Sequence, residues 1–143
     1  TEYGKIGCGI CWDQWFPECA RSITLLGADI ILYPTAIGSE PQDPNLNSKK
    51  HWENVMIGHS AANQIPIVAS NRIGEEVEDD IKINFYGGSF ITDHLGNIQD
   101  QMDSSTEGVI SHEINVDEIR KFRQSWGNFR DRRPDLYKKI CDF

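Results

Sequence analysis

The stretch KIGCGICWDQWFPE, residues 5–18, decides the fold of this chain. Its first half alternates apolar side chains with glycine, which predicts a β-strand whose one face carries Ile6, Cys8 and Ile10. Its second half predicts a helix that begins at once. Apolar residues recur there at helical spacing, at Trp15, Phe16, Cys19, Ala20, Ile23 and Leu26. Cys11 is therefore expected at the turn between a strand and a helix, with its sulfur exposed.

The position of Cys11 suits a nucleophile. Asp13 is expected to cap the helix and Pro17 to lie in its first turn. A thiol just before a helix N-terminus feels the positive end of the helix dipole, which favours the reactive thiolate. The backbone N–H of Trp12 lies next to the sulfur and is placed to donate to an oxyanion. The alternative is a buried structural cysteine, the commonest state of a free cysteine.

The following residues predict a β-α-β unit. Gly27 ends the helix, and residues 28–34 form an apolar run typical of a buried strand. A strand, a helix and a second strand this close together favour a parallel pair. The carboxyl ends of parallel strands carry the chemistry in such units. Cys11 and the loop 35–40 are therefore expected on the same edge of the sheet.

Further along, the pattern predicts helices over residues 48–63 and 115–122 and strands over 65–70, 85–92, 98–101 and 109–114. Ser48 is expected to cap the first of these helices. The acidic run 75–80 predicts an exposed loop or hairpin tip, and residues 93–97 predict a turn.

Composition excludes several classes of protein. The chain has 143 residues and a net charge of −8, without a basic cluster, which argues against binding nucleic acid. No apolar run is long enough to span a membrane and no signal peptide is visible. The cysteines are too clustered for a disulfide framework, so a reducing, cytoplasmic location is expected. Cys8 and Cys11 form a Cys-x-x-Cys pair, but a zinc site needs a second pair and a redox pair normally sits together at a helix start. The four histidines are not expected to bind metal or act as a base.

Six motifs resemble the carbon–nitrogen hydrolase (nitrilase) superfamily, and within it the N-carbamoylputrescine amidohydrolases. They are ICWDQWFPE at 10–18, LYPTAIGSEPQD at 32–43, HWENVM at 51–56, ASNRIG at 69–74, YGGSF at 86–90 and RDRRPDLY at 130–137. The resemblance implies an α/β fold, half of a four-layer α-β-β-α sandwich that is incomplete at its N-terminus. Residues 1–143 would form the C-terminal half of a single domain.

The resemblance also implies a set of site residues. Members use a Glu–Lys–Cys triad, in which Cys11 would be the nucleophile and the Trp12 N–H an oxyanion donor. The Glu and Lys lie upstream in the family, and Glu2 and Lys5 stand in neither motif. Glu18 could in principle replace the base, but its position seven residues after Cys11 favours a structural role. For substrate binding, the resemblance assigns Glu40 to an ammonium group, and Ala36 and the Trp12 side chain are expected to line the pocket.

The implied activity is hydrolysis of N-carbamoylputrescine to putrescine, carbon dioxide and ammonia, a step of polyamine biosynthesis, through a Cys11 thioester. The partners implied are a small cationic ureido substrate, the missing N-terminal half with its Glu and Lys, and further copies in a homo-oligomer. No metal or organic cofactor is implied. One alternative is a β-ureidopropionase or another nitrilase-like amidase. The other is a truncated or split scaffold without activity, and the isolated chain is expected to be inactive.

Overall fold

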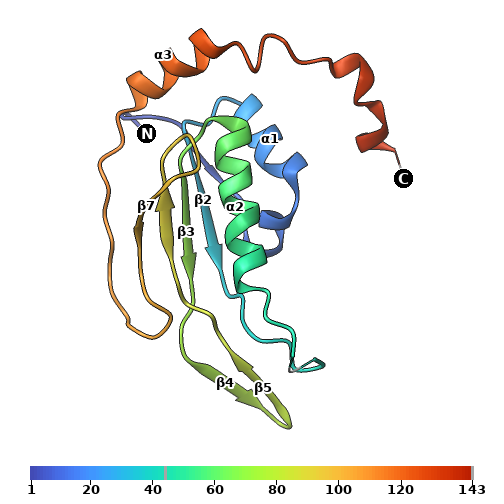
Figure 1. Ribbon diagram of the computed structural model, residues 1–143, viewed down its shortest axis with the longest axis vertical. Helices are drawn as coiled ribbons and strands as arrows, with labels where there is room; N and C mark the ends of the chain where they lie inside the picture. The colour runs from blue at the N-terminus through green and yellow to red at the C-terminus, as the bar shows by residue number, and fades with distance from the viewer. Residues whose placement is uncertain (44, 143) are drawn as a thin grey trace.

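A computed structural model describes residues 1–43 and 45–142, so the predicted domain 1–143 ends on Phe143, outside the described residues. It contains a five-stranded sheet, a two-stranded hairpin and helices against one face of the sheet (Figure 1). In chain order the elements are β1 (Ile6–Cys8), η1 (Cys11–Trp15), α1 (Pro17–Leu25), β2 (Ile30–Thr35), α2 (Lys49–Asn63), β3 (Ile67–Asn71), β4 (Glu75–Glu78), β5 (Ile81–Asn84), β6 (Phe90–Thr92), β7 (Ile98–Gln101), α3 (Val116–Trp126), η2 (Pro134–Leu136) and η3 (Lys138–Cys141).

The main sheet has the order β1-β2-β3-β6-β7. β1, β2 and β3 are parallel, with Ile6 opposite Ile30 and Ile31 opposite Ile67. β6 and β7 add to the sheet antiparallel. The predicted β-α-β unit and its parallel pair are confirmed. Because β1 and β2 are parallel, their carboxyl ends lie at the same end of the sheet. The turn at Cys11 and the loop after Thr35 follow these ends and therefore lie side by side.

The core lies between the sheet and the pair α1 and α2. Ile31, Tyr33 and Ile67 point from the sheet into this layer and are fully buried. Trp52 and Met56 of α2 fill it from the other side, and the Trp52 ring meets Phe90 edge-on at a centroid distance of 5.4 Å. Gly7 lies against Ile23, where a Cβ would approach the isoleucine to 2.1 Å, so only glycine lets β1 and α1 pack this closely.

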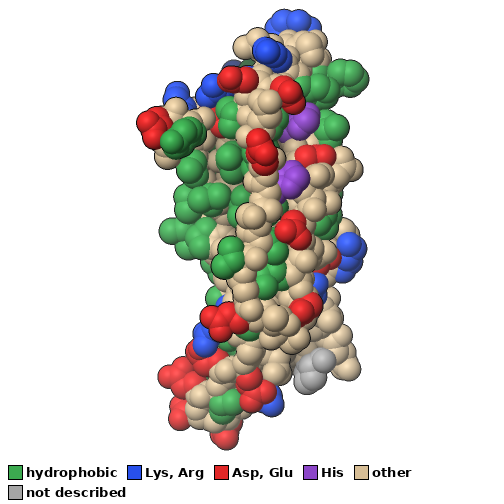
Figure 2. Space-filling model, turned by 90° about the vertical axis from the view of Figure 1, so that its left-hand side faces the viewer, with side chains coloured by type: hydrophobic (Ala, Val, Ile, Leu, Met, Phe, Trp, Pro, Cys, Tyr) green, Lys and Arg blue, Asp and Glu red, His purple; other side chains and the backbone are tan. Residues whose placement is uncertain are grey.

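The opposite face of the sheet is not covered by helices. The face of β1 that the sequence predicts as apolar points this way: Ile6 is 51% and Ile10 67% exposed. Figure 2 shows hydrophobic side chains gathered along one side of the molecule, above the acidic β4–β5 hairpin. An apolar sheet face of this kind is normally buried against a second layer.

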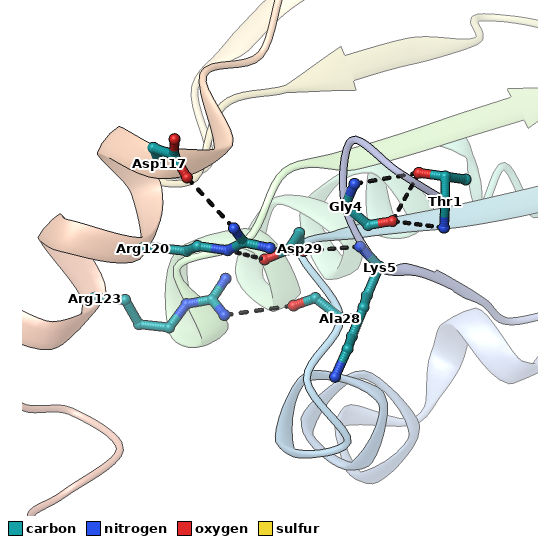
Figure 3. Close-up of polar contacts among 8 residues, drawn as sticks. All are labelled: Thr1, Gly4, Lys5, Ala28, Asp29, Asp117, Arg120 and Arg123. Atoms are coloured by element: carbon teal, nitrogen blue, oxygen red, sulfur yellow. Dashed lines mark hydrogen bonds and ion pairs between the residues drawn. The ribbon is translucent and has the colours of Figure 1, made fainter.

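Hydrogen bonds among charged residues hold α3 next to the N-terminal ends of β1 and β2 (Figure 3). Arg120 of α3 donates two hydrogen bonds to the buried carboxylate of Asp29, at 2.9 and 2.7 Å. The Lys5 N–H donates to the same carboxylate at 2.8 Å. Arg123 donates to the carbonyl oxygens of Ala28 and Gln64. Burial alone would raise the pKa of Asp29, but the hydrogen bonds from Arg120 and Lys5 hold it below its usual value.

Replacing Asp29 by asparagine should lower the free energy of unfolding at pH 7 by about 1.5–3 kcal/mol, the contribution of hydrogen bonds to a charged group. A carboxylate with a lowered folded pKa stabilises the fold above its unfolded pKa of about 3.9, and this stabilisation disappears as the pH falls through the folded value. The difference in the free energy of unfolding between wild type and Asp29→Asn should therefore become smaller towards pH 3. Urea unfolding at both pH values measures it. Asp117→Asn, which removes an exposed partner of the same arginine, is the control and should change little.

Several local predictions are wrong. Asp13 is not an N-cap: it lies inside η1, and its carboxylate accepts from the N–H of Ile10 at 2.8 Å. The α-helix begins only at Pro17 because the first turn after Cys11 is a 3₁₀ helix. Ser48 precedes α2 but its side chain makes no capping bond; its N–H donates to the Tyr86 hydroxyl at 3.2 Å instead. Residues 109–114 form no strand among the described residues. The run 75–80 is exposed as predicted, but only residues 79 and 80 form a hairpin tip, because Glu75–Glu78 is strand β4 and pairs with β5. The helices at 48–63 and after Asn115 are confirmed.

Candidate active site

Cys11 stands on a strained turn at the carboxyl end of β1. Its φ of +46° lies in the left-handed region, which a non-glycine residue rarely adopts. The turn is held from both sides: Gly9 N–H donates to Leu32 on β2 at 3.1 Å, and the Asp13 carboxylate holds the Ile10 N–H. Strained backbone of this kind persists only where its surroundings fix it, and it is concentrated at functional sites. The half-buried thiol is thus aimed out of the turn by a rigid frame.

The α-helix whose dipole the sequence places beside Cys11 begins farther from the sulfur than predicted. The first residue of α1, Pro17, lies six positions after Cys11, and Cys11 itself is the first residue of the 3₁₀ helix Cys11–Trp15. A helix dipole acts within about its first turn, so α1 contributes little at the sulfur. The Trp12 N–H has no hydrogen-bond acceptor among the described residues. It is an unpaired donor beside the thiol, which is the arrangement the oxyanion prediction needs.

The loop after β2 carries the other predicted residues, Ala36 and Glu40, and is anchored to the β4–β5 hairpin. Ser39 and Asn84 exchange two hydrogen bonds of 2.9 Å, and Ile37 accepts from the N–H of Tyr86. At Gly38 a Cβ would lie 2.5 Å from the Asn84 carbonyl oxygen, so the close approach of loop and hairpin requires glycine. The loop is therefore positioned by contacts and not left to move freely in solvent.

Cys11, Trp12, Ala36 and Glu40 line one cleft of about 480 Å³, so the structure brings all four predicted site residues together. Glu40 is exposed at its rim. Trp15 and His51 form another wall, with ring centroids 4.9 Å apart. Among the lining residues that the structure describes, Glu40 is the only carboxylate and no lysine or arginine occurs. The cleft is thus suited to a cationic group at the Glu40 end.

A buried glutamine ties the nucleophile turn to the rest of the fold, which the sequence analysis did not identify. Gln14 is 1% exposed, and its side-chain oxygen accepts from the Trp52 Nε1–H at 2.6 Å and from the Thr35 hydroxyl at 2.9 Å. One atom therefore links η1 to α2 and to the end of β2. The sequence around Gln14 has no pattern that indicates these contacts.

Gln14→Leu should lower the free energy of unfolding by about 1–3 kcal/mol, because it leaves the buried Trp52 N–H without an acceptor and removes the acceptor of the half-buried Thr35 hydroxyl. Urea unfolding measures the change. Gln124→Leu makes the same chemical change at an exposed position of α3 and should shift the value by less than about 0.5 kcal/mol. Equal effects of the two variants would show that the buried contacts of Gln14 contribute nothing.

Glu18 lies away from the Cys11 cleft, as the structural interpretation predicted. It lines a separate cleft with Arg21, His59 and Arg132 on the outer side of the helices. His59 is buried there, and burial lowers the pKa of its ring despite nearby Glu18. All four cysteines are free. Within residues 1–43 and 45–142, no three His, Cys, Asp or Glu side chains gather as a metal site would need, and no helix is long and apolar enough to cross a membrane.

Comparisons with known proteins agree with this arrangement. The family model described as Carbon-nitrogen hydrolase matches residues 1–124. An N-carbamoylputrescine amidase from Oryza sativa subsp. japonica is 56% identical, over 98% of this chain and 48% of that protein. A citrullinase from Francisella tularensis subsp. tularensis is 54% identical, over 98% and 49%.

A crystal structure of a carbon-nitrogen hydrolase from Helicobacter pylori superposes with a TM-score of 0.87 at 37% identity, over 97% of this chain and 50% of that one. The chain spans about half the length of the curated relatives it matches. The predicted α/β half-sandwich is confirmed by this superposition. By the match over residues 1–124, the chain belongs to the carbon–nitrogen hydrolase family.

Proposed function

We propose that this chain supplies the nucleophile and the cation-binding end of a thiol amidohydrolase that acts on N-carbamoylputrescine. The observation that carries the proposal is the shared cleft: Cys11 stands on a strained turn at one side of it and Glu40 on an anchored loop at the other. N-carbamoylputrescine has the matching chemistry, with a ureido carbon at one end and an ammonium at the other.

In the proposed reaction, the Cys11 sulfur bonds to the ureido carbon and the carbonyl oxygen becomes an oxyanion, to which the Trp12 N–H donates. The bond to the terminal nitrogen breaks, and that nitrogen leaves as ammonia after taking up a proton. Water then attacks the thiocarbamate carbon and releases the thiol. The resulting carbamic acid loses carbon dioxide and leaves putrescine. One water is consumed for one molecule each of putrescine, carbon dioxide and ammonia.

The family's reaction uses a Glu base and a Lys beside the thiol, but the described lining residues include no lysine and their one carboxylate, Glu40, is assigned to the substrate ammonium. Lys5 lines another cleft at the start of the sheet, with Ile30 and residues 113–117. Neither it nor the neighbouring Glu2 is placed at the Cys11 end. We therefore propose that a Glu and a Lys come from the half of the family domain that the relatives have and this chain does not match. The isolated chain is expected to bind substrate poorly and not to turn it over.

The test joins the unmatched half of the rice relative ahead of Thr1 and measures ammonia release from N-carbamoylputrescine. The fused protein should hydrolyse it, and the 143-residue chain alone should not. Activity of the chain alone would contradict the need for a second half. A folded fused protein without activity on any ureide would favour a scaffold without catalytic function.

Citrulline is the second candidate substrate, because one relative at 54% identity is a citrullinase. Citrulline carries a carboxylate beside its ammonium, and the described lining residues include no lysine or arginine to pair with it. The same argument disfavours the anionic substrate of a β-ureidopropionase. The fused protein should therefore have a higher kcat/KM for N-carbamoylputrescine than for citrulline. A higher kcat/KM for citrulline would instead identify citrulline as the substrate.

A further inference from the structure

A second cleft lies on the outer side of α1 and α2, away from the uncovered face of the sheet. Its volume is about 490 Å³, and its lining comes from α1, from the C-terminal part of α2 and from the tail residues 132–140. We call it the tail cleft. In Figure 1 the tail that carries η2 and η3 descends on the α1 side of the molecule. A second layer packed against the uncovered face of the sheet would leave the tail cleft open, because the helices lie between the two.

Two buried side chains of α2 border the tail cleft with polar atoms that have no partner. His59 is 5% exposed and Asn63 is 2% exposed. Within residues 1–43 and 45–142, neither ring nitrogen of His59 forms a hydrogen bond, and neither does Oδ1 of Asn63. The Asn63 amide is held in one orientation because its Nδ2 donates to the His59 carbonyl oxygen at 2.8 Å. Buried polar groups are almost always paired, so two such side chains at one opening indicate a polar ligand.

Two arginines border the same cleft without an anionic partner. Arg132 forms no hydrogen bond or ion pair within the part of the chain that the structure describes, although two other arginines of the tail do. Arg21 donates through one Nη to the Ala62 carbonyl oxygen at 2.9 Å, and its other Nη is buried and unpaired. Burial and the nearby charge of Arg132 lower the pKa of Arg21. Two like charges side by side in a half-buried cleft favour binding of an anion.

The unpaired groups identify the chemistry of this anion. Burial lowers the pKa of His59, so its neutral ring has one N–H donor, and the arginines have donors only. Charged oxygens of an oxyanion accept from these donors. Oδ1 of Asn63 needs a donor instead, which sulfate and carboxylates lack near neutral pH. A hydrogen phosphate group has both, because it keeps one O–H beside its charged oxygens. We propose that the tail cleft binds a hydrogen phosphate group, free or at the end of a small monoester.

The remaining lining residues agree with this ligand. Leu25, Ala62 and Ile140 are apolar, so the organic part of a monoester has a surface to contact. Glu18 is the one carboxylate among the described lining residues, and it is exposed, where water weakens its repulsion of an anion. No residue of the tail cleft lines the Cys11 cleft, so the inference does not rest on the proposed function.

Isothermal titration calorimetry of the fused protein tests the site, with Cys11→Ala present so that the result does not depend on catalysis. The probes are inorganic phosphate, glycerol 3-phosphate and sulfate at pH 6, close to the second pKa of a phosphate monoester at about 6. At least one phosphate should bind about tenfold or more tightly than sulfate, because sulfate leaves Oδ1 of Asn63 unpaired. The phosphate with the lower Kd distinguishes the free ion from a monoester. Sulfate binding as tightly as both phosphates, or no binding of either at about 10 mM, would overturn the inference.

Arg132→Gln provides the matched test. It should raise the Kd of the tighter phosphate at least about tenfold, because it removes a charged donor from the tail cleft. Lys138→Gln removes the same unit of charge from an exposed position of the tail outside the cleft lining, and it should change the Kd less than about twofold. Equal effects of the two variants would contradict the site, since binding would then follow net charge alone. An affinity that falls as protein concentration rises would also contradict it, because a second copy would then occupy the cleft.

Discussion

Replacing Cys11 by alanine in the fused protein should lower kcat for N-carbamoylputrescine by at least about a thousandfold, because the variant has no atom that can form the thioester. The strained turn should remain, since Gly9, Ile10 and Asp13 hold it by contacts that do not involve the sulfur. Ammonia release at saturating substrate measures kcat, and circular dichroism checks the fold.

Cys141→Ala is the control for this experiment, because that thiol is exposed in the tail and lines no part of the Cys11 cleft. It should leave kcat unchanged. A Cys11→Ala variant with more than a few per cent of wild-type activity would show that another group attacks the substrate. The assignment of the nucleophile would then be wrong, whatever the fold.

Glu40→Gln should raise KM for N-carbamoylputrescine by about 10–150-fold with little change in kcat, because the variant keeps the shape of the side chain and loses a charged hydrogen bond of about 1.5–3 kcal/mol. Butylurea has the same ureido group and carbon chain without the ammonium. Its KM should be nearly the same in both proteins. The ratio of the two KM values therefore isolates the ammonium contact.

Asp43→Asn is the matched variant, since it removes another exposed carboxylate three residues along the same loop, outside the cleft lining. It should change neither KM. If Glu40→Gln weakened both substrates equally, Glu40 would support the loop and not the ammonium. If it weakened neither, the cationic end of the substrate would bind elsewhere.

The sequence predicts the β-α-β unit well because the unit depends on patterns within short stretches. Each pattern indicates one local structure: alternation in residues 5–10, helical spacing after Pro17 and an apolar run before Pro34. The parallel order of β1 and β2 then places Cys11 and Glu40 at one edge. The shared edge follows from this topology, but other lining residues of the cleft, His51 of α2 and Ile83 of β5, come from elements that the β-α-β pattern does not place.

What the sequence misses depends on contacts between distant residues. The link from Gln14 to Trp52 and Thr35 has no periodic pattern, and the positive φ of Cys11 is imposed by hydrogen bonds around it. The residue type of Asp13 predicts an N-cap, but its carboxylate accepts from the Ile10 N–H from inside the turn. Residues 109–114 have strand character without a described partner, since pairing depends on a second strand and not on local preference alone.

The proposed function depends most directly on a covalent bond between the Cys11 sulfur and the ureido carbon. The direct measurement is peptide mass spectrometry of the fused protein, quenched with acid during turnover of N-carbamoylputrescine. The peptide containing Cys11 should carry the mass of the substrate less one ammonia. The adduct should disappear when the substrate is exhausted, and Cys11→Ala should show none. Turnover by Cys11→Ala at more than a few per cent of the wild-type rate, or an adduct on a different residue, would contradict the assignment of Cys11.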